Sequence, residues 1–254
     1  MTYQVLNREL KPLVRYEEMD NNLGRAAIRN RFLQYVAGDY LLFLDCDAEI
    51  SKEDFVQCYI DEIQKGRLVV CGSHRYVCSA DIDHSLKYRY GCSHEVRNAA
   101  LRMKDPNRSF MTGNFLISRE ILSQNRFDER LKKYGHEDTL MGFRLSQQHC
   151  SVWHIDNPID LRDIDSNEMF VQKTRESVSN LADIYGWVDH PNDFAAQVRL
   201  LSFYKRLKIW HLTTVVKTIY SLVEKHVEHR LIKGSGSLNA FNFYKIGLLC
   251  KVLG

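Results

Sequence analysis

The feature that most constrains the fold is YLLFLDCDAEI at residues 40–50, where five apolar or aromatic side chains lead directly into two aspartates. An apolar run of this length without alternation is typical of a strand covered on both faces of a parallel sheet. If the extended backbone continues through Cys46, Asp45 and Asp47 point to the same face. Two like charges about 4 Å apart repel by on the order of 1 kcal/mol in water. We therefore expect a cation or a hydrogen-bond donor to neutralise the pair.

Carboxylate oxygens suit Mg²⁺ or Mn²⁺, and either ion would also hold the phosphates of a ligand. The pair lies at the carboxyl end of its strand, which is where open α/β sheets bind ligands. An Asp-x-Asp sequence is equally compatible with a solvated turn. Both readings remain open from these residues alone.

Helix-like and strand-like segments alternate on either side of this run. We expect helices at residues 25–37 and 51–66, the second opened by a Ser51 cap, and strands at residues 40–45 and 67–73. This alternation indicates a doubly wound α/β sheet. Amphipathic helices are expected at the C-terminal end of the chain.

A second acidic pair, Glu137 and Asp138, follows a turn at Gly135 and opens a predicted helix. The N-terminal end of a helix dipole favours ionised carboxylates, so both residues could serve only as caps. A carboxylate kept ionised at the edge of a pocket is also what a general base requires. The two readings are compatible.

Charge is distributed unevenly along the 254 residues. Residues 194–254 carry ten Lys or Arg against two Glu, a net charge of +8, so with +3 overall the remainder carries −5. The basic tail could pack on the body of the protein, lie on an anionic membrane, or do both. No nucleic-acid recognition module accompanies the charge, so we expect no nucleic-acid partner.

Seven scattered cysteines without a C-x-x-C pair indicate neither a disulfide framework nor a zinc knuckle. Neither a signal peptide nor an apolar stretch of membrane-spanning length is visible. We expect a cytoplasmic protein, with the inner face of the cell membrane as a possible site of peripheral contact.

Two longer segments carry a family resemblance. NNLGRAAIRNRFLQYVAGDYLLFLDCDAEI resembles the pattern of family 2 glycosyltransferases, and SFMTGNFLISREIL followed by FDERLKKYGHEDTLMGFRL is similar to the acceptor half of these enzymes and to the galactosyltransferase-like C-terminal module. The tail resembles that of bacterial relatives that elongate surface polysaccharides. The resemblance covers about residues 8–185.

The resemblance implies a GT-A fold with a mixed sheet and inverting transfer of a hexosyl or N-acetylhexosaminyl group. The donor would be a UDP-sugar or another nucleotide sugar, and the acceptor a saccharide or a lipid-linked molecule of cell-envelope polysaccharide biosynthesis. On the donor side, Asp47 would bind Mn²⁺ or Mg²⁺ at the diphosphate, with Asp45 near the ribose and metal. Arg29 would hold the nucleotide, and Gly24 would allow a close backbone approach.

On the acceptor side, the resemblance makes Asp138 the base that deprotonates the attacking hydroxyl, with Glu137 orienting the acceptor. Gly113 and Asn114 would line this side. The family often completes the metal site with a histidine about two dozen residues after the acidic pair, but Leu161 stands in that window. His154 is the available substitute, or it simply ends a strand.

The family's usual N-terminal signatures for the nucleoside are absent, so we expect that the domain lacks its first βαβ unit. We therefore expect a glycosyltransferase domain at residues 1–188, incomplete at its N-terminus, and a basic helical tail at residues 189–254. A non-catalytic remnant or partner-binding module of the same fold is the main alternative. A nucleotidyltransferase is disfavoured because the acidic pair at 137–138 has no evident role there.

Overall fold

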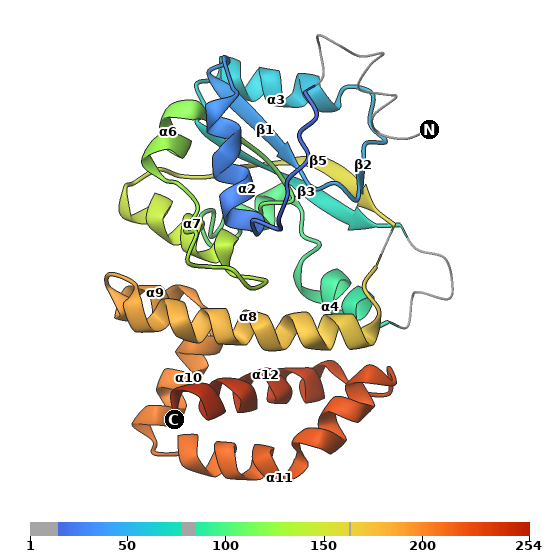
Figure 1. Cartoon of the computed structure of the whole chain (residues 1–254), viewed down its shortest axis with the longest axis vertical. Coiled ribbons are helices and arrows are strands. Elements are labelled where there is room, and N and C mark those ends of the chain that lie inside the picture. Colours follow the sequence, from blue (N-terminus) through green and yellow to red (C-terminus); the bar gives the residue numbers. More distant parts are fainter. Residues whose placement is uncertain (1–14, 78–84, 163) are drawn as a thin grey trace.

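The computed structural model describes residues 15–77, 85–162 and 164–254, and it shows a sheet-containing half above a layer of stacked helices (Figure 1). The upper half carries a five-stranded sheet, and α8 crosses below it. The remaining C-terminal helices lie beneath α8 (Figure 1).

The sheet is mixed, with strand order β1-β4-β3-β5-β2. β1 pairs antiparallel with β4, β4 antiparallel with β3, and β3 parallel with β5. The two-residue β2 pairs antiparallel with β5 at the other edge. The strands are β1 (Tyr40–Leu44), β2 (Ala48–Glu49), β3 (Val69–Tyr76), β4 (Asn114–Ser118) and β5 (Trp153–Leu161).

Alternate side chains of the central strands fill two separate cores. Val69 and Cys71 pack with side chains of α2 (Arg25–Arg31) and α7 (Glu137–Gln147) on one face. Val70, between them, packs against α3 (Phe55–Gln64) on the other face. Because strand side chains alternate between faces, this division covers the sheet with helices on both sides, as expected for a doubly wound α/β fold.

Two details of the expected secondary structure are wrong. β1 is antiparallel to its neighbour and lies at an edge of the described sheet, with alternating burial, rather than in a parallel sheet covered on both faces. The helix expected from residue 51 begins at Phe55, because the Ser51 hydroxyl accepts a hydrogen bond from Arg75 instead of capping the helix. Long-range contacts decided both points.

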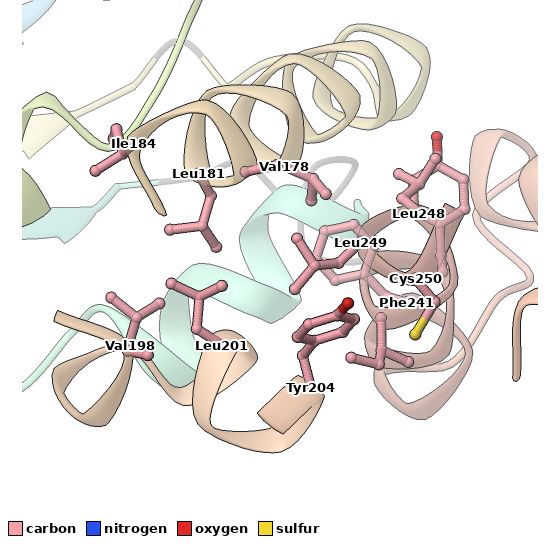
Figure 2. Packing of buried hydrophobic residues seen from close by; sticks show 14 of the residues in the cluster. Val178, Leu181, Ile184, Val198, Leu201, Tyr204, Phe241, Leu248, Leu249 and Cys250 are labelled. Atoms are coloured by element: carbon pink, nitrogen blue, oxygen red, sulfur yellow. The ribbon is translucent and has the colours of Figure 1, made fainter. Parts of the chain in front are cut away.

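The helical half is built around one hydrophobic core. Val178, Leu181 and Ile184 of α8 face Leu201 and Tyr204 of α10 and the C-terminal helix α12 (Figure 2). The expected domain boundary at residue 188 falls between helices that share this core, and the boundary stays a prediction. The remaining helices of the described chain are α4 (Leu86–His94), α5 (Ala99–Arg102), α6 (Arg119–Gln124), α8 (Asn167–Trp187), α9 (Pro191–Gln197), α10 (Arg199–Ile209), α11 (Thr213–Ile232) and α12 (Leu238–Leu253).

Within the described ranges, no helix combines the length and the hydropathy that crossing a bilayer requires.

A close backbone approach positions α7, the helix that carries the acidic pair. A Cβ at Gly142 would collide with the backbone carbonyl oxygen of Asn107. The Asn107 side chain donates to the carbonyls of Gly142 (3.3 Å) and Cys150 (2.7 Å). These two hydrogen bonds join the segment around Asn107 to α7 and to the loop that follows it. The backbone atom that blocks the position cannot rotate away as a side chain could.

We predict that Gly142→Ala lowers the free energy of unfolding by about 1–3 kcal/mol, because the added methyl group must displace backbone. Gly186→Ala is the matched control, since nothing lies within 4 Å of a Cβ there. It should be neutral or raise stability by about 0.5–1 kcal/mol. Urea denaturation of both variants measures the difference, and equal effects of the two substitutions would contradict the packing argument.

Candidate active site

Two arginines of α2 hold the aspartate that follows β1. Asp45 Oδ1 accepts from Arg29 Nη2, and Asp45 Oδ2 accepts from Arg25 Nη2, both at 3.1 Å. The two arginines are four residues apart and therefore lie on one face of the helix. The cations expected to neutralise this end of the strand are thus supplied, at Asp45, by the protein itself.

Arg25 also reaches the second acidic pair. Its Nε lies 3.6 Å from Glu137 Oε1, while its Nη2 contacts Asp45. One guanidinium therefore joins carboxylates that are 92 positions apart in the chain. The structure brings Asp45, Glu137 and Arg29 into one cluster of charges, with Asp138 adjacent to Glu137.

Burial sets the electrostatics of this cluster. Glu137 is only 6% exposed, and burial together with the neighbouring charge of Asp138 raises its pKa. Burial and the charge of Arg25 lower the pKa of Arg29, whose Nη1 is buried without a hydrogen-bond partner in the described part of the chain. Burial disfavours the charge of Arg25 as well, but Asp45 and Glu137 outweigh it and raise its pKa.

Two of the predicted glycines lie beside this cluster. The Asp45 amide donates to the Gly113 carbonyl at 3.0 Å, and a Cβ on Gly113 would come within 3.2 Å of Asp45 Oδ2. Gly24 directly precedes α2 and has φ +80°, a conformation that favours glycine. Gly24 therefore lets the chain turn into the helix that carries both arginines.

Asp138 lies in the first turn of α7, as the sequence predicted. Its Oδ1 accepts from the Thr139 amide at 2.7 Å and from the Thr139 hydroxyl at 3.3 Å. The residue before the helix, His136, is left-handed with φ 70° and makes no side-chain capping bond. Its Nδ1 instead lies 3.1 Å from the Thr139 hydroxyl oxygen. Oδ2 of Asp138 makes no hydrogen bond to another described residue, so one carboxylate oxygen is available to a ligand.

The loop before α7 is fixed by α8. The buried Asn180 amide donates from Nδ2 to the carbonyls of Lys133, Tyr134 and Gly135, at 2.9, 3.3 and 3.1 Å. Gly135 has φ +97°, and a Cβ there would lie 2.7 Å from the Ser177 hydroxyl oxygen. The position of the acidic pair therefore depends on a helix outside the sheet layer.

Asp47 is placed differently from Asp45. The Ala48 amide donates to the Asp45 carbonyl at 3.2 Å, which closes a turn, so the extended backbone expected through Cys46 is not formed. Asp47 is exposed in this turn and makes no hydrogen bond or ion pair within the described residues. The assumption that both aspartates project from one continuous strand is wrong.

The described carboxylates could hold a divalent cation only together with waters and substrate phosphates. Nowhere in residues 15–77, 85–162 and 164–254 do three His, Cys, Asp or Glu side chains gather so that they could ligate an ion. Mg²⁺ usually takes one or two carboxylates and completes its shell with waters and substrate phosphates. Asp47, an exposed carboxylate two residues after Asp45, matches that pattern. A ligand set supplied entirely by the protein does not exist in this part of the chain.

Two predicted site residues are committed to buried hydrogen bonds. His154 is 3% exposed, with Nδ1 2.9 Å from Arg102 Nη1 and Nε2 2.8 Å from the Pro106 carbonyl oxygen. Both ring nitrogens are occupied, and His154 does not join Asp45 and Asp47. The expected role of His154 as a metal ligand is therefore corrected to a buried structural role.

The role expected for Asn114 on the acceptor side is also corrected. Its Nδ2 donates to the carbonyls of Ser73 (2.9 Å) and Asn157 (2.8 Å), and its Oδ1 accepts from the Tyr59 hydroxyl. The amide is therefore fully used in joining β4 to β3, β5 and α3. It is buried and does not line the acceptor side.

Three residues of the site were missed from the sequence. Arg25 had a usable signal, since it lies one helical turn before Arg29. Tyr134, whose ring centroid is 5.5 Å from the Arg25 guanidinium carbon, and Asn180 had none, because their roles depend on how α8 meets the loop. Charge spacing within one helix can be read locally, but contacts between distant segments cannot.

Comparison with known proteins agrees with this arrangement. Residues 2–126 match the family model described as glycosyl transferase family 2. This part of the chain belongs to the family. The match includes β1, Asp45, Asp47 and both arginines of α2, and the mixed α/β sheet agrees with the GT-A fold expected for a family 2 glycosyltransferase. No curated protein sequence matches the chain.

Several solved structures are similar to the chain. A mycobacterial protein is 16% identical, with 67% of this chain and 53% of that chain covered and a TM-score of 0.41. Glucosyl-3-phosphoglycerate synthase from Mycobacterium tuberculosis, in complex with Mn²⁺, UDP and glucosyl-3-phosphoglycerate, is 18% identical, with 71% and 60% covered and a TM-score of 0.42. S. aureus TarS residues 1–349 in complex with UDP is 14% identical, with 97% and 77% covered and a TM-score of 0.48. The chain spans 53–60% of the length of the first two of these proteins.

We predict opposite pH dependences for two buried carboxyls. The pKa of Glu137 is raised above 4.5, so the native state keeps this proton longer than the unfolded chain does. The stability associated with it is present below 4.5 and is lost as pH rises through the raised pKa. Glu137→Gln should therefore gain stability relative to wild type as pH rises from about 4 to about 8.

Asp128→Asn is the control with the opposite sign. Arg130 first, and also Arg144, lower the pKa of Asp128 from 3.8. The stability that its carboxylate provides is present above 3.8 and is lost as pH falls through the lowered pKa. The cost of Asp128→Asn should therefore shrink at acid pH. Urea denaturation between about pH 2 and about pH 8 tests both, and a pH-independent difference for Glu137→Gln would contradict its raised pKa.

Proposed function

We propose that the chain is an inverting glycosyltransferase that moves a hexosyl or N-acetylhexosaminyl group from a nucleotide diphosphate sugar to an acceptor hydroxyl. The observation that carries this proposal is the joining of Asp45 and Glu137 by Arg25, since Glu137 directly precedes Asp138. Family membership supports the donor class. In this proposal the acceptor is a saccharide or a lipid-linked molecule of polysaccharide biosynthesis.

The residues divide into a donor side and an acceptor side. Arg29 and the backbone next to Gly24 and Gly113 contribute to holding the donor at the end of β1. Asp47, with Asp45, would hold Mn²⁺ or Mg²⁺, and such an ion neutralises charge on the leaving diphosphate when it is bound. Arg25 offsets the negative charge of Asp45 and Glu137, which would otherwise repel the donor phosphates.

Asp138 is the general base in this proposal. One of its oxygens is held by Thr139, and the other is available to accept a proton from the acceptor hydroxyl. The acceptor oxygen forms a bond to the anomeric carbon as the bond from that carbon to the diphosphate oxygen breaks. Glu137, which is buried and adjacent, positions the arginine and the acceptor rather than taking the proton.

We predict that Asp138→Asn lowers the rate of transfer by about 10²–10⁴-fold, because the variant cannot accept the proton. Asp183→Asn is the control, since Asp183 is exposed on α8 and away from the charge cluster. The measurement is release of nucleoside diphosphate from a panel of sugar nucleotides with Mn²⁺ and acceptors. Full rate in Asp138→Asn would overturn the base assignment.

The same assay distinguishes the proposed enzyme from the main alternative. A non-catalytic remnant or partner-binding module would bind a sugar nucleotide without turning it over, in wild type as well as in the variants. Binding of UDP followed by calorimetry, together with the absence of product from every donor, would favour that alternative. Transfer by wild type excludes it.

We also propose that the C-terminal helices contact an anionic membrane at its inner face. Trp210 is 71% exposed and Leu222 is 81% exposed, which is unusual for side chains of this size. Leu212, Val215, Ile219 and Leu222 follow helical spacing and lie along one side of α11. We call the following residues the apolar strip: Phe203, Ile209, Trp210, Leu212, Val215, Ile219 and Leu222.

Charge supports a lipid as the occupant of the apolar strip. The only two acidic residues in the range 194–254, Glu224 and Glu228, pair with Arg175 and Lys251. Lys208, Lys217 and Lys225 have no carboxylate partner within the described residues, so the positive charge of α10 and α11 is left uncompensated. Exposed tryptophan and aliphatic side chains with nearby lysines suit the interface of an anionic bilayer.

We predict that the double variant Trp210→Ser, Leu222→Ser reduces binding to vesicles rich in anionic phospholipid at least tenfold, because it removes the most exposed apolar area. Val56→Ser is the control, since Val56 is 55% exposed but lies on α3. Vesicle flotation measures the effect, and sedimentation equilibrium of the same samples tests self-association. Equal binding by wild type and the double variant, or loss of a dimer instead, would contradict the proposal.

A further inference from the structure

A lysine of the C-terminal helix α12 is half-buried beside α4. Lys245 Nζ lies 4.6 Å from the centroid of the Tyr90 ring and 4.8 Å from that of Phe241. It makes no hydrogen bond or ion pair with any described residue. A buried ammonium ordinarily has an anionic partner, and aromatic faces compensate only part of its lost hydration.

Glu95, the acidic residue whose charge acts on Lys245, is already paired with other side chains. Glu95 accepts from Lys87 Nζ at 2.9 and 3.1 Å and from the Tyr76 hydroxyl. His74, 3.8 Å from Glu95, has its pKa lowered by burial, so it adds no charge near neutrality. One anion therefore serves two lysines, and this cluster carries a surplus positive charge.

The surplus charge acts on the site described above. The pKa of His136, which precedes the acidic pair, is lowered by burial and by the charge of Lys245, while Asp138 opposes the shift. Burial lowers the pKa of Lys245 itself to about 8, and Glu95 opposes that shift. Lys245 is thus mostly protonated at neutral pH, and its charge is felt by the residue adjoining Glu137 and Asp138.

We propose that Lys245 binds an anionic group of the acceptor, of the phosphate class, and so selects acceptors that carry a phosphate near the attacking hydroxyl. This inference rests on the proposed function and deepens it by naming the acceptor class. The aromatic rings of Tyr90 and Phe241 hold the ammonium in place, and a phosphate supplies the partner that no described residue provides. The C-terminal helix then belongs to the acceptor site as well as to the core below α8.

Direct binding is tested first, without turnover. Lysines of the full chain are converted to ¹³C-dimethyl-lysine and titrated by NMR with sodium phosphate, against sodium chloride at equal ionic strength. The Lys245 signal is assigned by its loss in Lys245→Arg. We expect it to shift with saturation in phosphate only, while the signal of exposed Lys104 does not. Identical shifts in phosphate and chloride would overturn the inference.

Transfer is tested with paired acceptors, each neutral sugar beside its phosphate ester. Loss of a charge-assisted contact should lower kcat/KM for the phosphorylated member about 10- to 100-fold in Lys245→Met. Lys245→Arg should restore most of it, and Lys104→Met should retain the wild-type preference. Equal use of both members by wild type, or an equal loss for both in Lys245→Met, would overturn the inference.

The source of the phosphate is resolved by comparing soluble sugar phosphates with a polyprenyl diphosphate sugar in detergent. Either preference supports phosphate recognition and names its carrier. If no donor and acceptor pair is turned over, the proposed function fails, and the NMR titration still decides whether Lys245 binds phosphate. If transfer occurs without preference for phosphate, only the further inference fails.

Discussion

The candidate site depends on one guanidinium that balances two carboxylates from distant parts of the chain. Without Arg25, Asp45 at the end of β1 and Glu137 at the start of α7 would face each other with uncompensated charge in a partly buried space. Desolvation makes such repulsion several times larger than in water. The ion pairs of Arg25 therefore offset this repulsion. They allow the acid at the end of β1 and the acid at the start of α7 to lie in one cluster.

The helices beneath the sheet contribute to the same site. Asn180 of α8 holds three successive carbonyls of the loop that leads into α7, and Gly135 allows this loop to approach Ser177 closely. The same α8 packs into the core of α10 and α12 (Figure 2). A perturbation of the C-terminal helices therefore has a continuous route of packed side chains to the acidic pair. Lys245 extends this connection, because it belongs to α12 and lies near α4.

Much of the fold could be predicted because its signals are local. The spacing of apolar residues placed α2, and the acidic pair correctly marked the start of α7. The helix expected at Ser51 began later because that hydroxyl bonds to Arg75, 24 positions away. Strand direction in the sheet could not be predicted, since an apolar run such as 40–44 fits a central parallel strand and an edge antiparallel one equally well.

The sequence by itself determined the chemistry available at this site: two aspartates after an apolar strand, arginines one helical turn apart, and two acids at the start of a helix. Only the tertiary structure decided which polar groups are still available for that chemistry. In the sequence, Asn114 and His154 are as plausible as ligand-binding residues as Asp47. In the folded chain, however, Asn114 is hydrogen-bonded to neighbouring strands and His154 to Arg102. Hydrogen bonds between distant segments form only when the chain is folded, so the residue type states what a side chain can do and the packing states whether it is free to do it.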